Sequence, residues 1–440
     1  MENPAPVQPN PNPPPQKPKR NWKKISLILL IGLFLISLVG VGLYLLIPRL
    51  AEQPDSPTQN QATPSSKPKK SSPLKNKIIF TKTITTNQKY TAPWGVELTK
   101  SDSDIYIMNA DGTGETKIFD FDPSDSTNYV SQISLSPKGN YLGWLKYSDN
   151  NNTSIQYTSV SDKTKKSATT LLSTKGIRGF AFSPNEKQVA VLIGSKNPPN
   201  LKGAITSVTI RIYQVDTKTL IKEFETVAGS GKENERINVS RNSIAWLNDN
   251  KIITFGRNQN GTYLASYSIK DGLSSENRIT KPSKNLVQVI GINSSKNKIA
   301  YPVINSKEGN YENSSQEIWL ANVDGSNKKM VTKFSLGSSI RSLEFAPDGN
   351  WLAIPTNNAE ATEFHLVNLV ENKVVKTNLP FLSAVWSPKS DSLVVDNGVY
   401  ANKITLIGLD GKPTKDLTSL SEQSNKQGTV SRYGLVEWVR

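Results

Sequence analysis

Short runs of alternating apolar and polar residues recur along the chain from about residue 77 onward. Gly179–Leu192 reads GFAFSPNEKQVAVL, Ser342–Ile354 reads SLEFAPDGNWLAI and Ser383–Val395 reads SAVWSPKSDSLVV. In each copy an alternating strand ends in an aromatic residue, a Ser-Pro or Ala-Pro turn follows, and a second apolar strand begins. Because proline has no backbone N–H, it marks the end of the first strand. The pattern therefore predicts a strand–turn–strand unit that is repeated along the chain.

The spacing of this unit predicts the architecture. The bulky residue that ends the first strand recurs at Leu135, Phe182, Trp246, Ile292, Phe345, Trp386 and Trp438, at intervals of 47, 64, 46, 53, 41 and 52 residues. A third strand leads into Asp-Gly at residues 111–112, 324–325 and 410–411, and this dipeptide supplies the positive φ values of a tight hairpin. A fourth strand follows. Periods near 40–50 residues with four strands each are typical of propeller blades. We therefore expect an all-β fold, a seven-bladed β-propeller, with six or eight blades as alternatives.

The two ends of the repeated region are out of phase. Leu435–Arg440 reads as a first strand, whereas Lys77–Thr83 reads as a second strand. The last blade is therefore expected to combine one C-terminal strand with three N-terminal strands, which closes the ring without a free edge. Large side chains at the ends of the first strands are expected to pack between adjacent blades. These blade-core aromatics are Phe182, Trp246, Phe345, Trp386 and Trp438.

The repeats also resemble a known family. FSPNEKQVAVL, FAPDGNWLAI, WSPKSDSLVV and IYIMNADGTGETKI are similar to the TolB-type, WD-like β-propeller repeats of bacterial envelope proteins. The resemblance covers about residues 77–440 and implies the propeller fold. It implies no particular activity, because the matching residues are structural: similar propellers bind a lipoprotein or precede a peptidase domain.

The N-terminal part of the chain predicts a membrane anchor. Residues 25–47 are 23 residues without a charge, long enough as a helix to cross a hydrocarbon core of about 30 Å. A cleaved signal peptide is the alternative, but its apolar region is shorter. The flanks of the span are Trp22, Lys23, Lys24, Tyr44 and Arg49. Positive charge concentrates before the span, so we expect a single-pass protein of the cell membrane with a cytoplasmic N-terminus and an extracytoplasmic propeller.

Two segments outside the propeller have compositions that cannot form a core. Residues 1–24 are a Pro-rich, basic tail that we expect to be disordered in the cytoplasm, and residues 48–76 are a disordered Pro/Ser/Lys linker. The domain order is therefore tail (1–24), transmembrane helix (25–47), linker (48–76) and propeller (77–440). A signalling role for the tail is a further alternative.

Composition removes several classes of function. The formal net charge is +16, but much of the excess lies in the tail and the linker, so no clustered basic face predicts nucleic-acid binding. The sequence has no cysteine and one histidine, His365, which excludes disulfides, thiol nucleophiles and Cys- or His-pair metal sites. His365 occupies a blade position that is Tyr106 or Trp319 in other copies, so we interpret it as a blade residue rather than a general base.

Other candidate chemistry is weak. No G-x-S-x-G elbow and no phosphate-binding loop is present. Asp120, Asp122 and Asp125 could supply oxygens to Ca²⁺, but they lack the pattern of an EF-type loop and are interpreted as turn residues. We predict no catalytic residue, no cofactor and no metal.

These observations favour a non-catalytic binding module of the cell envelope, held at the membrane, with a protein, peptide or glycan partner. The alternative is a propeller enzyme, of lyase or glycosidase type, that uses carboxylates in the central channel. Two facing Asp or Glu side chains in that channel would favour the enzyme.

Overall fold

The computed structural model describes the chain from Leu74 to Arg440 with interruptions. The described ranges are 74–91, 97–121, 129–148, 152–160, 168–196, 205–226, 244–258, 261–279, 289–305, 315–334, 339–357, 362–377, 381, 383–396, 403–419 and 430–440. The predicted tail, transmembrane helix and its five flanking residues lie outside them. Among the residues described, no helix has the length and apolar character to cross a membrane.

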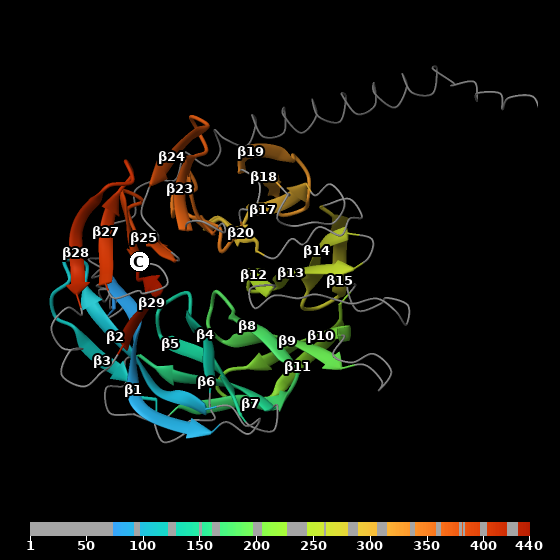
Figure 1. The fold of residues 1–440 in the computed structure, drawn as a ribbon. Helices are drawn as coiled ribbons and strands as arrows, with labels where there is room; N and C mark the ends of the chain where they lie inside the picture. The colour runs from blue at the N-terminus through green and yellow to red at the C-terminus, as the bar shows by residue number, and fades with distance from the viewer. Residues whose placement is uncertain are drawn as a thin grey trace, which may run out of the picture. The chain divides into compact units, whose positions relative to one another are not determined.

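The described strands form seven antiparallel sheets that follow one another around a ring (Figure 1). Blade 1 contains β29 (Val430–Trp438), β1 (Lys77–Thr91), β2 (Glu97–Asn109) and β3 (Thr116–Phe119). Blade 2 contains β4 (Tyr129–Leu135), β5 (Tyr141–Tyr147), β6 (Asn152–Ser159) and β7 (Thr169–Lys175). Blade 3 contains β8 (Ile177–Phe182), β9 (Gln188–Lys196), β10 (Ile205–Gln214) and β11 (Leu220–Glu225).

The other four blades repeat this order. Blade 4 contains β12 (Ile244–Asn248), β13 (Lys251–Asn258), β14 (Gly261–Ser268) and β15 (Gly272–Arg278). Blade 5 contains β16 (Gly291–Ile292), β17 (Lys298–Asn305), β18 (Ser315–Asn322) and β19 (Lys329–Phe334). Blade 6 contains β20 (Ser339–Ile340), β21 (Glu344–Phe345), β22 (Trp351–Asn357), β23 (Thr362–Asn368) and β24 (Lys373–Thr377). Blade 7 contains β25 (Ala384–Trp386), β26 (Ser392–Asp396), β27 (Lys403–Gly408) and β28 (Pro413–Ser419). The seven-bladed propeller expected from the repeats is confirmed.

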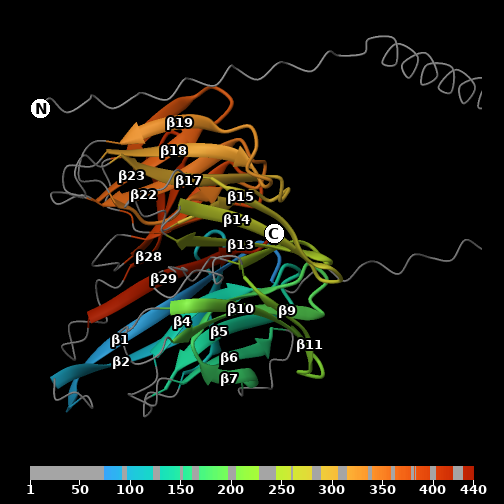
Figure 2. The ribbon, with the colours of Figure 1, turned by 90° about the vertical axis from the view of Figure 1, so that its right-hand side faces the viewer.

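Blade 1 takes strands from both ends of the chain. β29 pairs antiparallel with β1, with Trp438 opposite Ile78 and Gly434 opposite Thr81, and the two strands run side by side (Figure 2). β29 also contacts β25 of blade 7 and β4 of blade 2. This single strand therefore closes the ring.

The propeller begins before Lys77. The Asn76 N–H donates to the Val439 carbonyl at 2.9 Å, and Leu74 is buried in a cluster with Ile79 and Val439. The predicted linker, residues 48–76, is therefore too long by these three residues, because the apolar Leu74 side chain packs beside the closing strand instead of remaining in solvent.

The large residues at the ends of the first strands pack toward the preceding blade. Phe182 of blade 3 stacks on Tyr141 of blade 2, with ring centroids 6.2 Å apart. The other members of the set make equivalent contacts. The Trp246 indole N–H donates to the Ala181 carbonyl of blade 3, and the Trp386 indole N–H donates to the Glu344 carbonyl of blade 6. Phe345 packs in a cluster with Ala300 and Ile318 of blade 5. Trp438 packs in a cluster with Val394 and Ile404 of blade 7. All five side chains are buried. The core is therefore a set of inter-blade clusters, and no blade covers both of its faces alone.

Blade 6 departs from the repeat because its first strand is split into β20 and β21, both of which pair with β22. Pro355 of β22 accepts a hydrogen bond from the Arg341 N–H at 3.0 Å. The N–H and C=O of one residue point to the same side of a strand. Pro355 therefore lacks an N–H donor on the side of β22 that pairs with β20 and β21. The ladder is interrupted there, immediately before Glu344.

We expect Trp438→Ala to lower the free energy of unfolding by about 3–5 kcal/mol, because the indole fills the contact between blades 1 and 7. Val370→Ala is the matched control, since Val370 is 70% exposed, and it is expected to change the value by less than about 0.5 kcal/mol. Urea unfolding of the full chain in detergent measures both. Equal, small losses for the two variants would show that the closing strand does not stabilise the ring.

Candidate functional site

One end of the central channel widens into a cavity of about 1180 Å³, which we name the channel mouth. All seven blades contribute to its wall through the ends of their first strands and the turns that follow. The lining residues lie within 132–139, 180–184, 244–247, 290–296, 342–345, 383–386 and 435–440. Because the closing strand β29 supplies the last of these segments, the mouth is complete only when the ring is closed.

The turns that form the rim share one backbone conformation. In five of the described turns the fourth residue has positive φ, and its N–H donates to the carbonyl of the first residue at 2.8–3.0 Å. The fourth residues are Gly139, Glu186, Lys296, Gly349 and Ser390. Glycine adopts this left-handed conformation without strain, whereas another residue needs compensating contacts. Three of the five residues, Glu186, Lys296 and Ser390, are not glycine.

Two of those three residues hold neighbouring turns together. The Glu186 carboxylate of blade 3 is buried and accepts hydrogen bonds from blade 2, including 2.6 Å bonds from the Lys138 N–H and the Asn140 side-chain amide. The Ser390 hydroxyl of blade 7 accepts a 3.0 Å bond from the Asp348 N–H of blade 6. The rim is thus cross-linked from turn to turn.

Two further contacts extend this cross-linking. The Asn185 N–H of blade 3 donates to the Asp249 carboxylate of blade 4 at 2.7 Å. The Ser294 hydroxyl of blade 5 donates to the Pro347 carbonyl of blade 6. Such a rim preorganises the side chains that it presents, because each turn is fixed by its neighbours.

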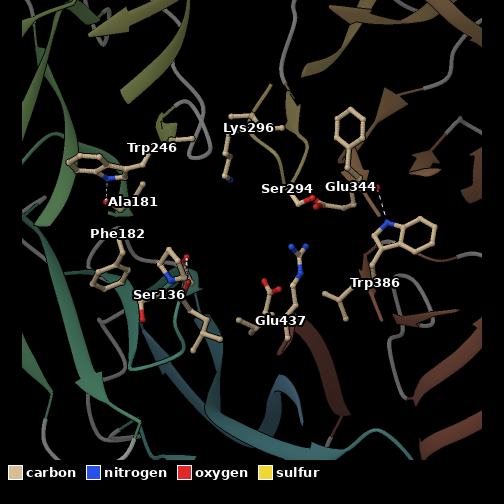
Figure 3. Close-up of a pocket in the computed structure, with 18 of the residues that line it drawn as sticks. Ser136, Ala181, Phe182, Trp246, Ser294, Lys296, Glu344, Trp386 and Glu437 are labelled. Carbon is tan, nitrogen blue, oxygen red and sulfur yellow. Dashed lines mark hydrogen bonds between the residues drawn. The ribbon is translucent and has the colours of Figure 1, made fainter. Parts of the chain in front are cut away.

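The third residue, Lys296, directs its side chain into the channel mouth instead. Figure 3 shows Lys296, Glu344 and Glu437 projecting into the same cavity from blades 5, 6 and 1. Arg440 also lines the cavity. With Lys138 of the rim, the channel wall therefore carries two carboxyl groups and three cationic groups.

Glu344 has a pKa that is raised well above its ordinary value. Its side chain is accessible to water in the cavity, but the ring encloses that water, so the carboxylate is less well hydrated than on an open surface. This desolvation raises the pKa of Glu344 to about 7, and repulsion from Glu437 acts in the same direction, while a hydrogen bond with Ser342 opposes both. Glu344 therefore exchanges a proton near neutral pH.

Glu437 has a different environment. Burial raises its pKa, but attraction to Arg440 and Lys296 opposes the shift. The pKa of Lys296 is lowered by burial and by Arg440, and Glu437 opposes that shift. Lys296 and Arg440 thus both interact electrostatically with Glu437. Within the described ranges, neither carboxyl forms an ion pair shorter than 4 Å.

Four of the five predicted blade-core aromatics, Phe182, Trp246, Phe345 and Trp386, also line the mouth. The indole N–H groups of Trp246 and Trp386 are already bonded to carbonyls of the neighbouring blade, at 2.9 and 2.8 Å. All four side chains are buried, so they support the wall of the mouth and present little surface of their own to the cavity.

His365 lies away from the channel mouth, on β23. It is buried against Phe334 of blade 5, with ring centroids 4.7 Å apart, and its Nε2 atom is 3.3 Å from the Glu363 carboxylate. Burial lowers the pKa of His365 and outweighs the effect of Glu363. Its position is that of a blade residue packed between blades 5 and 6.

The acidic segment considered for Ca²⁺ is described only in part, since Asp122 and Asp125 lie outside the described residues. Asp120 is exposed and lies 3.6 Å from the Lys117 amine, which also contacts the buried Asp104 at 2.5 Å. In the part of the chain that the structure describes, no group of three or more His, Cys, Asp or Glu side chains is placed to hold a metal ion.

The charged residues of the mouth were not predicted from the sequence, although the repeats contain the signal. The residue before the bulky strand-end residue lines the cavity in six blades: Ser134, Ala181, Ala245, Glu344, Val385 and Glu437. This position is small or apolar in four of them and glutamate in the other two. Aligning the repeats on the bulky residue would have identified both carboxyl groups.

Comparison with known proteins supports the fold and gives no family. No family model matches the chain, and no curated protein sequence matches it. Among solved structures, acylaminoacyl peptidase from Pyrococcus horikoshii is 13% identical with a TM-score of 0.51, over 80% of this chain and 52% of that one. TolB from Acinetobacter baumannii is 12% identical with a TM-score of 0.43, over 68% of this chain and 62% of that one. An oligogalacturonate lyase from Vibrio parahaemolyticus is 13% identical with a TM-score of 0.45, over 77% and 86%.

At these identities the similarity shows a β-propeller fold alone. The chain spans about half the length of the peptidase and less than two thirds of TolB. Function therefore has to be argued from the residues of the channel mouth.

The carboxyl group of Glu344 should make stability depend on pH. Its folded pKa of about 7 lies above the ordinary value of 4.5, so the folded chain holds this proton more tightly than the unfolded chain does. Its contribution to the free energy of unfolding is full below pH 4.5 and is lost as the pH rises through 7. We therefore expect wild type to lose stability relative to Glu344→Gln over this range in urea unfolding.

Glu437→Gln removes the neighbouring negative charge and should move that loss to lower pH. The exposed Glu276 of β15 provides the matched control, Glu276→Gln, which should run parallel to wild type. Parallel curves for wild type and Glu344→Gln would contradict the perturbed environment of Glu344.

Proposed function

We propose that this protein is a membrane-anchored, extracytoplasmic binding module that holds a protein, peptide or glycan of the cell envelope at its channel mouth. The observation that carries the proposal is the mouth itself: a cavity of about 1180 Å³ with a cross-linked rim and converging charged groups. A large concave site with apolar walls and a few convergent polar groups is the usual form of a ligand site.

The predicted anchor and linker support the location. The apolar span at residues 25–47 and the flanking charges favour insertion with the propeller outside the cytoplasm. A linker of about 26 residues, from residue 48 to residue 73, would then hold the propeller away from the membrane surface with a reach of roughly 30 Å. Such a tether lets the mouth meet a partner in the envelope.

Binding is favoured over catalysis by the inventory of groups at the mouth. The chain's single histidine lies elsewhere, and the Ser294 hydroxyl is engaged with the Pro347 carbonyl. No serine of the mouth therefore has an imidazole base beside it, as an activated serine nucleophile usually does.

A second candidate function has one observation in its favour. Glu344 and Glu437 share a cavity, and Glu344 has a pKa of about 7. Two carboxyl groups with different proton affinities are the arrangement that glycosidases use for acid–base catalysis. Turnover of cell-wall glycan by the full chain, abolished in Glu344→Gln, would establish this enzyme and replace the binding module.

One experiment tests both location and binding, and it uses the absence of cysteine from the chain. Ser295→Cys places a thiol at the mouth, where a membrane-impermeant, thiol-reactive photo-crosslinker is applied to intact cells. We expect labelling from outside and, after illumination, a covalent adduct with a discrete envelope component. The adduct is expected because the thiol lies where the proposed partner would bind.

Two matched variants are the controls. Lys175→Cys, on the exposed outer strand β7, should be labelled but should yield no adduct, and Asn10→Cys in the N-terminal tail should be labelled only after lysis. Labelling of Asn10→Cys in intact cells would reverse the orientation. The same adducts from Ser295→Cys and Lys175→Cys, or none from either, would refute binding at the mouth.

A further inference from the structure

The charges of the channel mouth are unevenly distributed. Lys296 and Arg440 both act on Glu437, which leaves this group of three with a net charge of about +1. Glu344, by contrast, is influenced by burial, by the like charge of Glu437 and by the Ser342 hydroxyl, and no cation among the described residues contributes to its pKa. Glu344 is therefore the carboxyl group of the mouth that no described cation offsets, although it lines the same cavity as Lys296 and Arg440.

A ligand that complements this arrangement carries two opposite charges. Its anionic group would lie at Lys296 and Arg440, and its cationic group would compensate Glu344, whose charge no residue in the described ranges offsets. A purely anionic ligand would leave Glu344 without a partner, and a purely cationic one would leave the positive group without a partner.

The size and the walls of the cavity limit further which class of ligand would fit. At about 1180 Å³ the mouth exceeds the range of roughly 300–1,000 Å³ that is usual for drug-sized ligands, so it has room for several residues of a peptide. Ala384, Val385 and Phe345 supply apolar wall next to Glu344. Apolar wall next to charged groups suits a backbone with small side chains and charged ends.

We propose that the channel mouth binds a short peptide with a free amino terminus, whose ammonium group lies at Glu344 and whose carboxylate lies at Lys296 and Arg440. This inference rests on the proposed function and specifies its ligand. Glu344 and Lys296 are then the residues that determine specificity.

The assignment implies a pH dependence with a definite sign. The charged groups that face Glu344 across the mouth are Glu437, Lys296, Arg440 and Lys138, of which Lys138 is turned toward the Asn185 carbonyl at 3.3 Å. Glu344 must be ionised to pair with an ammonium group. Peptide affinity should therefore rise as the pH increases through about 7.

Three synthetic probes separate the two charges: trialanine, N-acetyl-trialanine, which lacks the ammonium group, and trialanine amide, which lacks the carboxylate. Isothermal titration of each into the full chain in detergent micelles gives the Kd. We expect trialanine to bind most tightly and each blocked peptide to bind at least about tenfold more weakly, because each loses one ionic contact.

Two variants connect each charge with its residue. Glu344→Gln should lower the affinity for trialanine about tenfold and leave the affinity for N-acetyl-trialanine unchanged. Lys296→Ala should lower the affinity for trialanine and leave the affinity for trialanine amide unchanged. Lys175→Ala on β7 is the matched control and should change none of the three. Urea midpoints of the variants show whether the fold is retained.

Equal binding of the three peptides, no binding of any, or a Glu344→Gln effect of the same size on all of them would overturn the inference. The proposed function fails separately. An adduct at Ser295→Cys that persists while the peptides do not discriminate would retain the binding module and reject the peptide terminus as its ligand.

Discussion

The pairing of β29 with β1 is the constraint on which the rest of the structure depends. Each blade covers its faces only against its neighbours, so an open ring would expose two apolar sheet faces to water. Hydrogen bonds from β29 to β1, together with Trp438 packed against blade 7, join the first and last segments of the propeller. The same strand carries Glu437 and leads directly to Arg440. Closure therefore completes the fold and the channel mouth together.

Much of this fold could be predicted from the sequence, because the same strand–turn–strand pattern occurs in several copies. A bulky residue followed by Ser-Pro or Ala-Pro located the first strands, and the mismatch of phase between Leu435–Arg440 and Lys77–Thr83 predicted the shared blade. The docking of Leu74 was missed, since a single apolar residue in a Pro- and Lys-rich context has no periodicity to indicate burial. The split first strand of blade 6 follows from Pro355, whose missing N–H matters only once its pairing side is known.

The candidate site was less predictable for a different reason. Glu344 and Glu437 are 93 residues apart in the sequence, and nothing local indicates that they meet. Their proximity is a product of ring geometry, which brings the residue before each bulky strand-end residue to one channel. The position of Lys296 in the mouth could not be predicted for a similar reason. A lysine in a polar turn has the pattern of an ordinary surface residue, and only the ring geometry places this turn on the rim. The perturbation of Glu344 then arises from enclosure by the whole ring.

These features describe a scaffold whose blades supply rigidity and whose few non-repeated residues supply chemistry. Glutamate at two cavity-facing positions and lysine at a strained turn position are departures from the repeat, and all three converge on one cavity. The turn-to-turn hydrogen bonds of Glu186 and Ser390 fix the rim on which they act. Similarity of fold to a peptidase leaves the activity open, so the proposals for this chain rest on the charges that converge at the mouth.

The central claim is that closure brings Glu344 and Glu437 into one cavity, and cross-linking tests it most directly. The cysteine-free chain carrying Glu344→Cys and Glu437→Cys is treated with a short bifunctional maleimide, and the products are mapped by mass spectrometry after proteolysis. A high yield of the intramolecular cross-link between these two positions is predicted, with none for Glu344→Cys combined with Lys175→Cys. The absence of the first cross-link, while each single cysteine reacts, would contradict the shared channel mouth and the closed ring that forms it.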